Sequence, residues 1–248
     1  MPRPDTIYFF GTCVIDLVYP DAGIAGMQLL RRAGVRVIYP DAQTCCGQPA
    51  FNSGYREEAL AVARAQLACF PQDYPVVVPS GSCAGMIKHH WPELFAGQPD
   101  EALARDIAQR TYELTEFLVD VLDLQLHDSG APTTVAIHTS CSARREMGVA
   151  DRIEALLAQL ANVEVLEPAH ATECCGFGGT FSLKQPEISG AMAIAKSKAL
   201  QATGACRVIS QDCGCLMNLS GTMEKQGQDL PTQHIAEFLM ERTDGVSK

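Results

Sequence analysis

The sequence has few basic residues and no long apolar run, and these absences exclude two classes of function. Lysine and arginine number 19 against 29 acidic residues, so the positive footprint of a nucleic-acid-binding protein is missing. No apolar stretch approaches the roughly 18 residues that a transmembrane helix needs. The apolar segment Ile7–Phe10 is too short for the core of a signal peptide. We therefore expect a cytoplasmic protein with no membrane span and no nucleic-acid partner.

Cysteine, in contrast, is abundant, with 11 residues in a chain of 248. A reducing compartment keeps thiols free, so this number indicates metal binding rather than a disulfide framework. The spacing C-x-x-C is absent from the sequence. Its absence excludes the usual zinc-ribbon and bacterial ferredoxin patterns.

The cysteines recur in the same order in both halves of the chain. Each half has a vicinal pair followed by glycine, with one cysteine upstream of the pair and one downstream. The first set is Cys13, Cys45, Cys46 and Cys83, and the second is Cys141, Cys174, Cys175 and Cys215. Matching members lie 128 to 132 positions apart. Such a nearly constant separation indicates an internal duplication.

Short β-branched runs precede the cysteines, and alanine-rich segments lie between them. The runs predict buried strands, whereas Arg56–Leu67 and Glu187–Ala202 predict helices. We predict an α/β fold of two tandem, duplicated, Rossmann-like domains, 1–128 and 129–248, joined at the polar segment His127–Gly130. Each would have a mainly parallel sheet flanked by helices. The cysteines then gather at the carboxyl-terminal rim of the strands, where such sheets bind ligands.

The vicinal pairs indicate which metal these thiols suit. A disulfide between sequence neighbours is strained, and two adjacent thiolates diverge. Divergent sulfurs fit two irons of one cluster better than one tetrahedral zinc ion. The residues therefore favour an iron–sulfur cluster, while zinc stays open as an alternative.

The repeated pattern Cys…Cys-Cys-Gly…Cys resembles the cysteine-rich domain of heterodisulfide reductase B-type subunits and glycolate oxidase iron–sulfur subunits. Within that group the sequence is most similar to the lactate utilization protein A family. The motifs that carry this likeness include Cys45-Cys46-Gly47-Gln48-Pro49 and Cys174-Cys175-Gly176-Phe177-Gly178-Gly179. The likeness covers essentially the whole chain.

The resemblance implies an iron–sulfur electron-transfer subunit of a complex that oxidises L-lactate to pyruvate. Such a subunit is a component of an oxidoreductase rather than a complete catalyst, and its sequence presents no evident catalytic residue. Its partners would be a ferredoxin-type iron–sulfur subunit and a third, small subunit. It would carry two clusters of the 4Fe–4S type. The implied ligands are Cys13, Cys45, Cys46 and Cys83 for one cluster, and Cys141, Cys174, Cys175 and Cys215 for the other.

The sequence departs from the fuller family motif, which ends each repeat in C-x-x-C. Met86 and Asn218 stand at these last positions. A fifth thiolate is then absent unless Cys213, which aligns with Gly81, serves in the second half. The departure favours four-cysteine clusters. A heterodisulfide-reductase-like thiol–disulfide oxidoreductase and a structural zinc module remain the alternatives.

Other residues of suggestive chemistry have simpler interpretations. Cys69 and Cys206 lie outside the repeat, and we expect both to be buried free thiols. His138 aligns with an apolar residue at a strand end, so we expect a packed residue or a neighbour of the metal site. His89–Trp91 has no partner at metal-ligand spacing and is expected at an exposed helix end.

Overall fold

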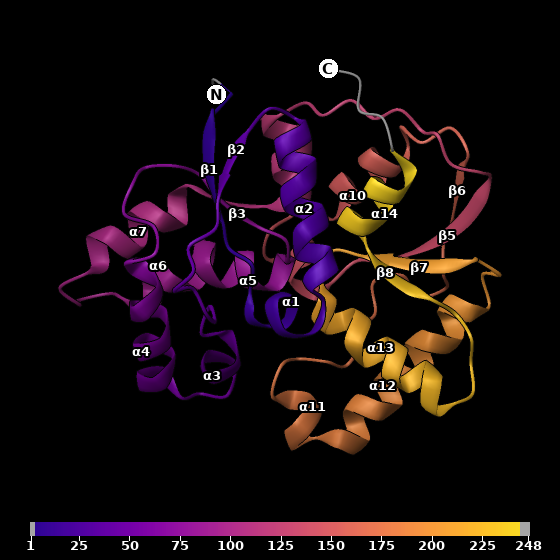
Figure 1. Ribbon diagram of the computed structural model, residues 1–248. Helices are drawn as coiled ribbons and strands as arrows, with labels where there is room; N and C mark the ends of the chain where they lie inside the picture. The colour runs from indigo at the N-terminus through magenta and orange to yellow at the C-terminus, as the bar shows by residue number, and fades with distance from the viewer. Residues whose placement is uncertain (1–2, 244–248) are drawn as a thin grey trace.

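Residues 3–243 are described in a computed structural model (Figure 1). They form two sheets of four parallel strands, with the orders β2-β1-β3-β4 and β6-β5-β7-β8. The first sheet consists of β1 (Thr6–Phe9), β2 (Arg36–Ile38), β3 (Val76–Val78) and β4 (Thr111–Glu113). The second consists of β5 (Thr133–His138), β6 (Val163–Leu166), β7 (Arg207–Ser210) and β8 (Thr232–His234). The predicted pair of similar α/β domains is confirmed, and the boundary after residue 128 stays a prediction.

Helices connect the strands in each half. Those of the first half are α1 (Cys13–Val18), α2 (Pro20–Arg32), α3 (Gln48–Asn52), α4 (Arg56–Leu67), α5 (Gly81–Gly85), α6 (Trp91–Leu94), α7 (Glu101–Gln109) and α8 (Leu114–Glu116), with π-helical turns η1 (Met86–His90) and η2 (Phe117–Val121). Those of the second half are α9 (Cys141–Arg145), α10 (Ala150–Leu157), α11 (Phe181–Lys184), α12 (Pro186–Gln201), α13 (Cys213–Lys225) and α14 (Ile235–Arg242). The two helices predicted from composition correspond to α4 and α12. Within residues 3–243, no helix is long and apolar enough to span a bilayer.

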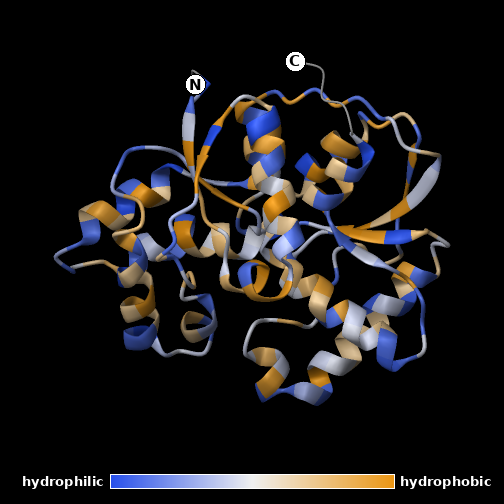
Figure 2. Ribbon diagram, in the orientation of Figure 1, coloured by the Kyte–Doolittle hydropathy of each residue, from blue (hydrophilic) through white to orange (hydrophobic). Residues whose placement is uncertain are grey.

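The largest apolar core is shared by the two sheets. It contains Phe9 and Val77 from the first sheet and Ile137 and Ile209 from the second. Helices α2 and α14 pack against each other in the space between the sheets (Figure 1). Hydrophobic and hydrophilic bands alternate along α2, as expected for a helix with one buried face (Figure 2). Separating the halves would therefore expose apolar surface, which stabilises their arrangement.

The two halves also end in the same local structure. Glu113 closes β4 and caps α8, while His234 closes β8 and caps α14. In both cases a glutamate three residues later, Glu116 or Glu237, accepts a hydrogen bond from the capping residue's own N–H. The duplication therefore extends beyond the cysteines to the last helix of each half.

An ion pair ties the segment between the halves to the last helix. The guanidinium of Arg242 donates to both carboxylate oxygens of Asp128, at 2.9 Å each, and both side chains are almost fully buried. Burial opposes ionisation of Asp128, but the hydrogen bonds from Arg242 and from the N–H groups of Asn162 and Gly130 outweigh it and lower the pKa of Asp128.

We expect Asp128→Asn to lower the free energy of unfolding by about 3 kcal/mol, because it leaves the buried Arg242 charge unpaired. Because the pKa is lowered, the stabilisation is present above the ordinary value of 3.8 and is lost as the pH falls through the folded-state value. Urea unfolding followed by circular dichroism measures both effects. The matched control is Asp151→Asn, whose ion pair with Arg152 is exposed and is worth less than about 1 kcal/mol. Equal losses in the two variants would contradict the prediction.

Candidate metal centres

The strand order places a ligand site at the centre of each sheet. In the order β2-β1-β3-β4, chain connections diverge between β1 and β3, and ligands bind at the carboxyl ends of such strands. Cys13 follows β1 and begins α1, while Cys83 follows β3 and lies in the first turn of α5. Cys141 and Cys215 have the same places after β5 and β7. Upstream and downstream cysteines therefore face each other across the divergence point.

The first thiol group consists of Cys13, Cys45, Cys46 and Cys83. The Sγ atoms of Cys13 and Cys45 are 3.7 Å apart. Contacts continue from Cys45 to Cys46 and from Cys46 to Cys83. Cys46 is buried and the other three are half-buried. The four thiols border one cavity of about 70 Å³.

The second thiol group consists of Cys141, Cys174, Cys175 and Cys215. Its contacts run in the same order, from Cys141 to Cys174, on to Cys175 and then to Cys215. Cys175 and Cys215 are buried, and a cavity of about 210 Å³ borders all four residues. The structure thus brings the eight predicted residues together as two groups of four. Their role as metal ligands stays a prediction.

One thiol in each group has a lowered pKa. Cys13 donates to Cys45, and with Cys46 and the N–H of Gly47 this holds the pKa of Cys45 well below its usual range. Cys141 acts in the same way on Cys174, whose pKa is also low. The partner thiols Cys13 and Cys141 have raised pKa values, because they are the donors of these bonds and are partly buried. Each group therefore offers one thiolate to a cation, while the donor thiol, Cys13 or Cys141, stays protonated until a metal displaces its proton.

The glycine after each vicinal pair is required by the turn. Gly47 has φ 90° and Gly176 has φ 84°, in the left-handed region. A Cβ atom at these positions would lie 3.0 Å from the carbonyl oxygen of Ala59 and 2.6 Å from that of Ser189. The turn in the second half also brings the N–H of Gly176 within 3.3 Å of the Cys174 sulfur. Glycine thus permits both the sharp turn and close packing against α4 or α12.

A side chain from a later helix holds the second cysteine of each pair. The indole N–H of Trp91 donates to the Cys46 carbonyl at 3.0 Å, and the Asn218 amide donates to the Cys175 carbonyl at 2.8 Å. The prediction that Trp91 lies at an exposed helix end is wrong, because its side chain is fully buried. Asn218, which replaces a cysteine of the fuller motif, fixes the loop of the second group.

The two cysteines outside the repeat differ in exposure. Cys69 is a buried free thiol, as predicted. Cys206 is exposed, so the prediction of a buried thiol is wrong there. It lies just before the first residue of β7, where its N–H donates to Thr134. This is the amino-terminal end of the strand, whereas the thiol groups lie at the carboxyl-terminal ends.

Cys213 faces the other half of the molecule. It begins α13, two residues before Cys215, and two positions correspond to about 200° around a helix. Cys215 therefore borders the cavity of the second group, while Cys213 borders that of the first and packs against Ile15 and Ala22. Burial raises the pKa of its thiol. The sequence suggested Cys213 as an extra ligand of the second half, but the structure places it beside the first group.

The two cavities are neighbours with a common wall. Residues that border both are Gln48, Ser82, Phe177, Gly179 and Gly214. At Gly214 a Cβ atom would lie 2.5 Å from the Phe177 ring, so the helix and the ring are in close contact. The two thiol groups are thus separated by a thin layer of protein.

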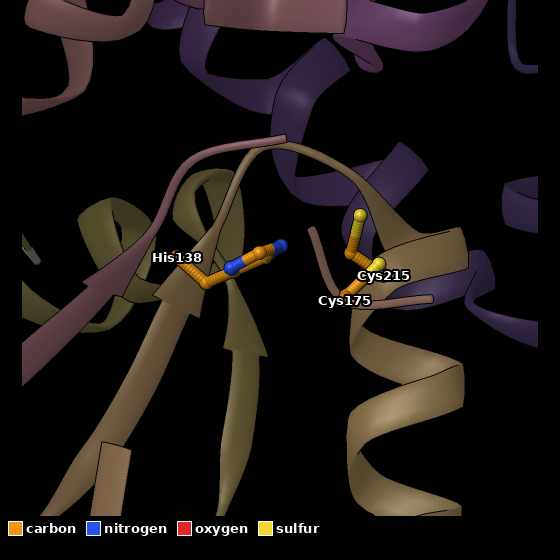
Figure 3. A group of neighbouring side chains, drawn as sticks. All are labelled: His138, Cys175 and Cys215. Carbon is orange, nitrogen blue, oxygen red and sulfur yellow. The ribbon is translucent and has the colours of Figure 1, made fainter. Parts of the chain in front are cut away.

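His138 is part of the second site (Figure 3). It closes β5, and its ring lies close to the sulfurs of Cys175 and Cys215, with the three ligand atoms all within 4.8 Å of one another. The ring is buried, and neither nitrogen has a hydrogen-bond partner among residues 3–243. Burial lowers the pKa of His138 to about 4, so the ring is neutral at pH 7. The sequence predicted a packed residue or a neighbour of the site but offered no signal for the unpartnered nitrogens.

Two parallel sheets that each present a vicinal cysteine pair and two further cysteines at one rim define a tandem cysteine-rich protein. The family model described as "Cysteine-rich domain" matches residues 7–88 and 135–220. Lactate utilization protein A of Oceanobacillus iheyensis is 43% identical over 240 residues, covering 96% of this chain and 98% of that protein. Lactate utilization protein A 2 of Bacillus cereus is 38% identical and covers 98% and 99%. The chain belongs to the lactate utilization protein A family.

The fold has a counterpart among solved structures. A crystal structure of a hypothetical protein from Helicobacter pylori matches with a TM-score of 0.59 at 13% identity. The match covers all of this chain and 51% of the other, so this chain spans about half of that protein's length. At such low identity the likeness supports the fold alone.

We expect Gly176→Ala to lower the free energy of unfolding by about 2 kcal/mol, because the new Cβ meets the Ser189 carbonyl in a left-handed turn. Urea midpoints measure the change. The control is Gly190→Ala in the same helix region, where a Cβ meets no atom within 4 Å and helix propensity improves by about 1 kcal/mol. A Gly176→Ala protein as stable as the unsubstituted protein would refute the steric argument.

Proposed function

We propose that this protein holds two iron–sulfur clusters of the 4Fe–4S type, one in each thiol group, and that it is the electron-transfer subunit of a complex oxidising L-lactate to pyruvate. The observation that carries the proposal is the pair of four-thiol groups, built in the same order at the same rim of two similar sheets. The curated relatives are named for lactate utilization. Their names supply the metabolic context.

The donor set fits an iron–sulfur cluster. All four donors of each group are sulfur, which suits iron–sulfur clusters and zinc. The adjacent sulfurs lie in contact in both groups, so the divergence expected from the sequence does not separate a cluster from zinc here. The repeated Cys-Cys-Gly pattern, which resembles that of iron–sulfur subunits, favours the cluster. The N–H of Gly176 beside the Cys174 sulfur is the kind of hydrogen bond that tunes the potential of a cluster. A bound cluster would supply one-electron transfer.

The chain's own residues hold and shield these groups. Trp91 and Asn218 fix the loops of the vicinal pairs, and Gly47 and Gly176 permit the turns. Burial of Cys46 and Cys175 keeps water from one side of each group. These contacts orient the thiols and limit rearrangement when the charge of the site changes.

Lactate oxidation itself would involve partner proteins. We propose a ferredoxin-type iron–sulfur subunit and a third, small subunit as partners, with the complex in the cytoplasm. A carbon-bound hydrogen must be removed from lactate, which calls for a base and a two-electron acceptor. The thiol groups supply neither, since they are occupied by the metal in this proposal. The chain would then receive electrons from another component.

One observation favours a second candidate function. Cys213 places a fifth thiol at the cavity of the first group, and a thiol–disulfide oxidoreductase could use such a thiol. Reduction of a heterodisulfide by the isolated chain would support this alternative. A colourless protein with stoichiometric zinc would support the structural zinc module and contradict both redox functions.

Analysis of iron and acid-labile sulfide in anaerobically purified protein tests the cofactor. We expect Cys46→Ser and Cys175→Ser each to lower both contents by about half, because each removes a central ligand of one cluster. The matched control is Cys206→Ser, an exposed cysteine outside both groups, which should leave both contents unchanged. Full iron content in Cys175→Ser would refute the ligand assignment.

The lactate role is tested with the complex. We expect L-lactate to bleach the visible absorption of the chain only when the partner subunits are present, since this proposal assigns the base and the two-electron acceptor to the partners. D-lactate provides the stereochemical control. Failure of L-lactate to reduce the clusters in the reconstituted complex would overturn the lactate role while leaving the cofactor assignment intact.

A further inference from the structure

Equivalent positions in the two halves carry different charges around the thiol groups. The correspondence between α4 and α12 is set by Gly47 and Gly176, which contact Ala59 and Ser189. From these residues onward the buried positions match at a constant separation. They are Ala59, Ala63, Gln66 and Leu67 in α4, and Ser189, Ala193, Lys196 and Ser197 in α12. Lys196 therefore occupies the place of Gln66.

Both of these residues hold the loop that leads to a vicinal pair. The Gln66 amide donates to the Thr44 hydroxyl at 2.8 Å and accepts from the Thr44 N–H at 2.7 Å. The Lys196 ammonium donates to the carbonyls of His170 and Ala171, at 3.0 Å each. Lys196 is fully buried, and it interacts electrostatically with the second thiol group. The same structural task is thus done by a neutral amide in one half and by a cation in the other.

The first helices of the halves differ in the same direction. Cys13 and Cys141 begin α1 and α9, so Asp16 corresponds to Arg144 and Leu17 to Arg145. Asp16 accepts a hydrogen bond from Tyr39. Arg144 donates to the Ala171 carbonyl, and the charge of Arg145 acts on the Cys141 thiol. The second site therefore has two cations where the first has one anion and one apolar residue.

The strand ends differ as well. Phe10 is fully buried at the end of the first strand, and His138 has its place in the second half. A neutral imidazole carries one N–H donor. One ring nitrogen of His138 lies within 4.8 Å of two sulfurs of the second group, and neither nitrogen has a hydrogen-bond partner in the described part of the chain (Figure 3). Phenylalanine provides no such donor.

Three acidic residues oppose this trend, since the exposed Glu146, like Asp212, borders the cavity of the second group. Asp212 borders its cavity and accepts hydrogen bonds from the hydroxyls of Ser80 and Ser82 and from the N–H of Ser82. Glu173, next to Cys174, is exposed. Three cations and these three anions balance at the second site, while the corresponding positions of the first site carry one anion, Asp16, and no cation, so the second site is the more positive of the two. Asp212 accepts hydrogen bonds from Ser82, which also borders the first cavity, so its negative charge acts on both sites and not on the second alone.

We propose that the second thiol group holds the higher-potential of the two centres, so that an electron entering the first centre passes on to the second. This inference rests on the proposed function. Reduction adds one negative charge to a centre, and neighbouring cations and N–H donors stabilise that charge. In this step one electron leaves the first centre and enters the second, with no bond broken and no proton moved. The electron comes to the first centre from the reduced iron–sulfur partner.

The shared wall of the cavities supports this route. Phe177 and Gly214 border both sites, so only a thin layer of protein separates donor and acceptor. The burial of Lys196 also matters, because a charge in a low-dielectric interior acts more strongly than one at the surface.

The test is a reductive titration of the anaerobic full chain with dithionite, followed by electron paramagnetic resonance. His138→Phe and Lys196→Gln each give the second half the side chain of the first. We expect two one-electron waves in the unsubstituted protein. In each variant we expect a lower midpoint potential for the higher-potential wave and an unchanged potential for the other. The expected fall is at least about tenfold in the reduction equilibrium, which is about 59 mV for one electron.

Further variants show which centre gives each wave, and one of them changes no buried side chain. Cys46→Ser should retain the higher-potential wave and Cys175→Ser the lower one. Arg145→Leu alters only an exposed side chain and should also lower the higher wave, while Gln66→Lys should raise the lower one. Retention of the higher wave by Cys175→Ser would overturn the inference. So would unchanged potentials in His138→Phe, Lys196→Gln and Arg145→Leu proteins of full iron content. Unsubstituted protein without iron would instead overturn the proposed function itself.

Discussion

Four thiols joined by a chain of contacts are the constraint on which the rest of each half depends. Such groups repel one another as they ionise, and each buried sulfur loses hydration. The fold offsets this by ending strands and beginning helices at the same rim, since helix N-termini present N–H groups and positive partial charge. Cys141 begins α9, and Cys215 lies in the first turn of α13. The parallel sheet thus suits the site because it directs several helix N-termini to one place.

The vicinal pair imposes its own requirement on the packing around it. Two successive side chains can approach the same group only if the backbone turns sharply after them, and Gly47 and Gly176 make that turn. The carbonyl of the second cysteine then needs a partner, which Trp91 and Asn218 supply from different positions of the following helices. Two unrelated side chains meet one need, so the duplicated halves conserve the geometry of the loop while the residues that enforce it have diverged.

The sequence could predict features that repeat along the chain, but not those that depend on contacts between the halves. The cysteine spacing and the β-branched runs predicted two parallel sheets, and alanine-rich composition predicted α4 with its observed ends. Helix geometry alone directs Cys213 away from Cys215, but the sequence could not show that it then borders the first cavity, because that depends on how the two halves pack. Trp91 was missed because nothing local indicates that its indole is needed by a loop 45 residues earlier. Likewise, exposure of Cys206 follows from its place at a strand start, which its own neighbours in sequence do not reveal.

The shared core explains why the divergence between the halves falls where it does. Phe9 and Ile137 pack in one apolar cluster, so neither sheet can change its inner face independently. Lys196 and Arg145 lie outside that cluster and can vary in charge without disturbing it. Under the proposed function this freedom has a use. Oxidation of lactate to pyruvate releases two electrons, whereas an iron–sulfur centre carries one at a time. Two centres within one chain can hold both electrons, and unequal charges around them determine which centre is reduced first, an order that two identical centres would lack.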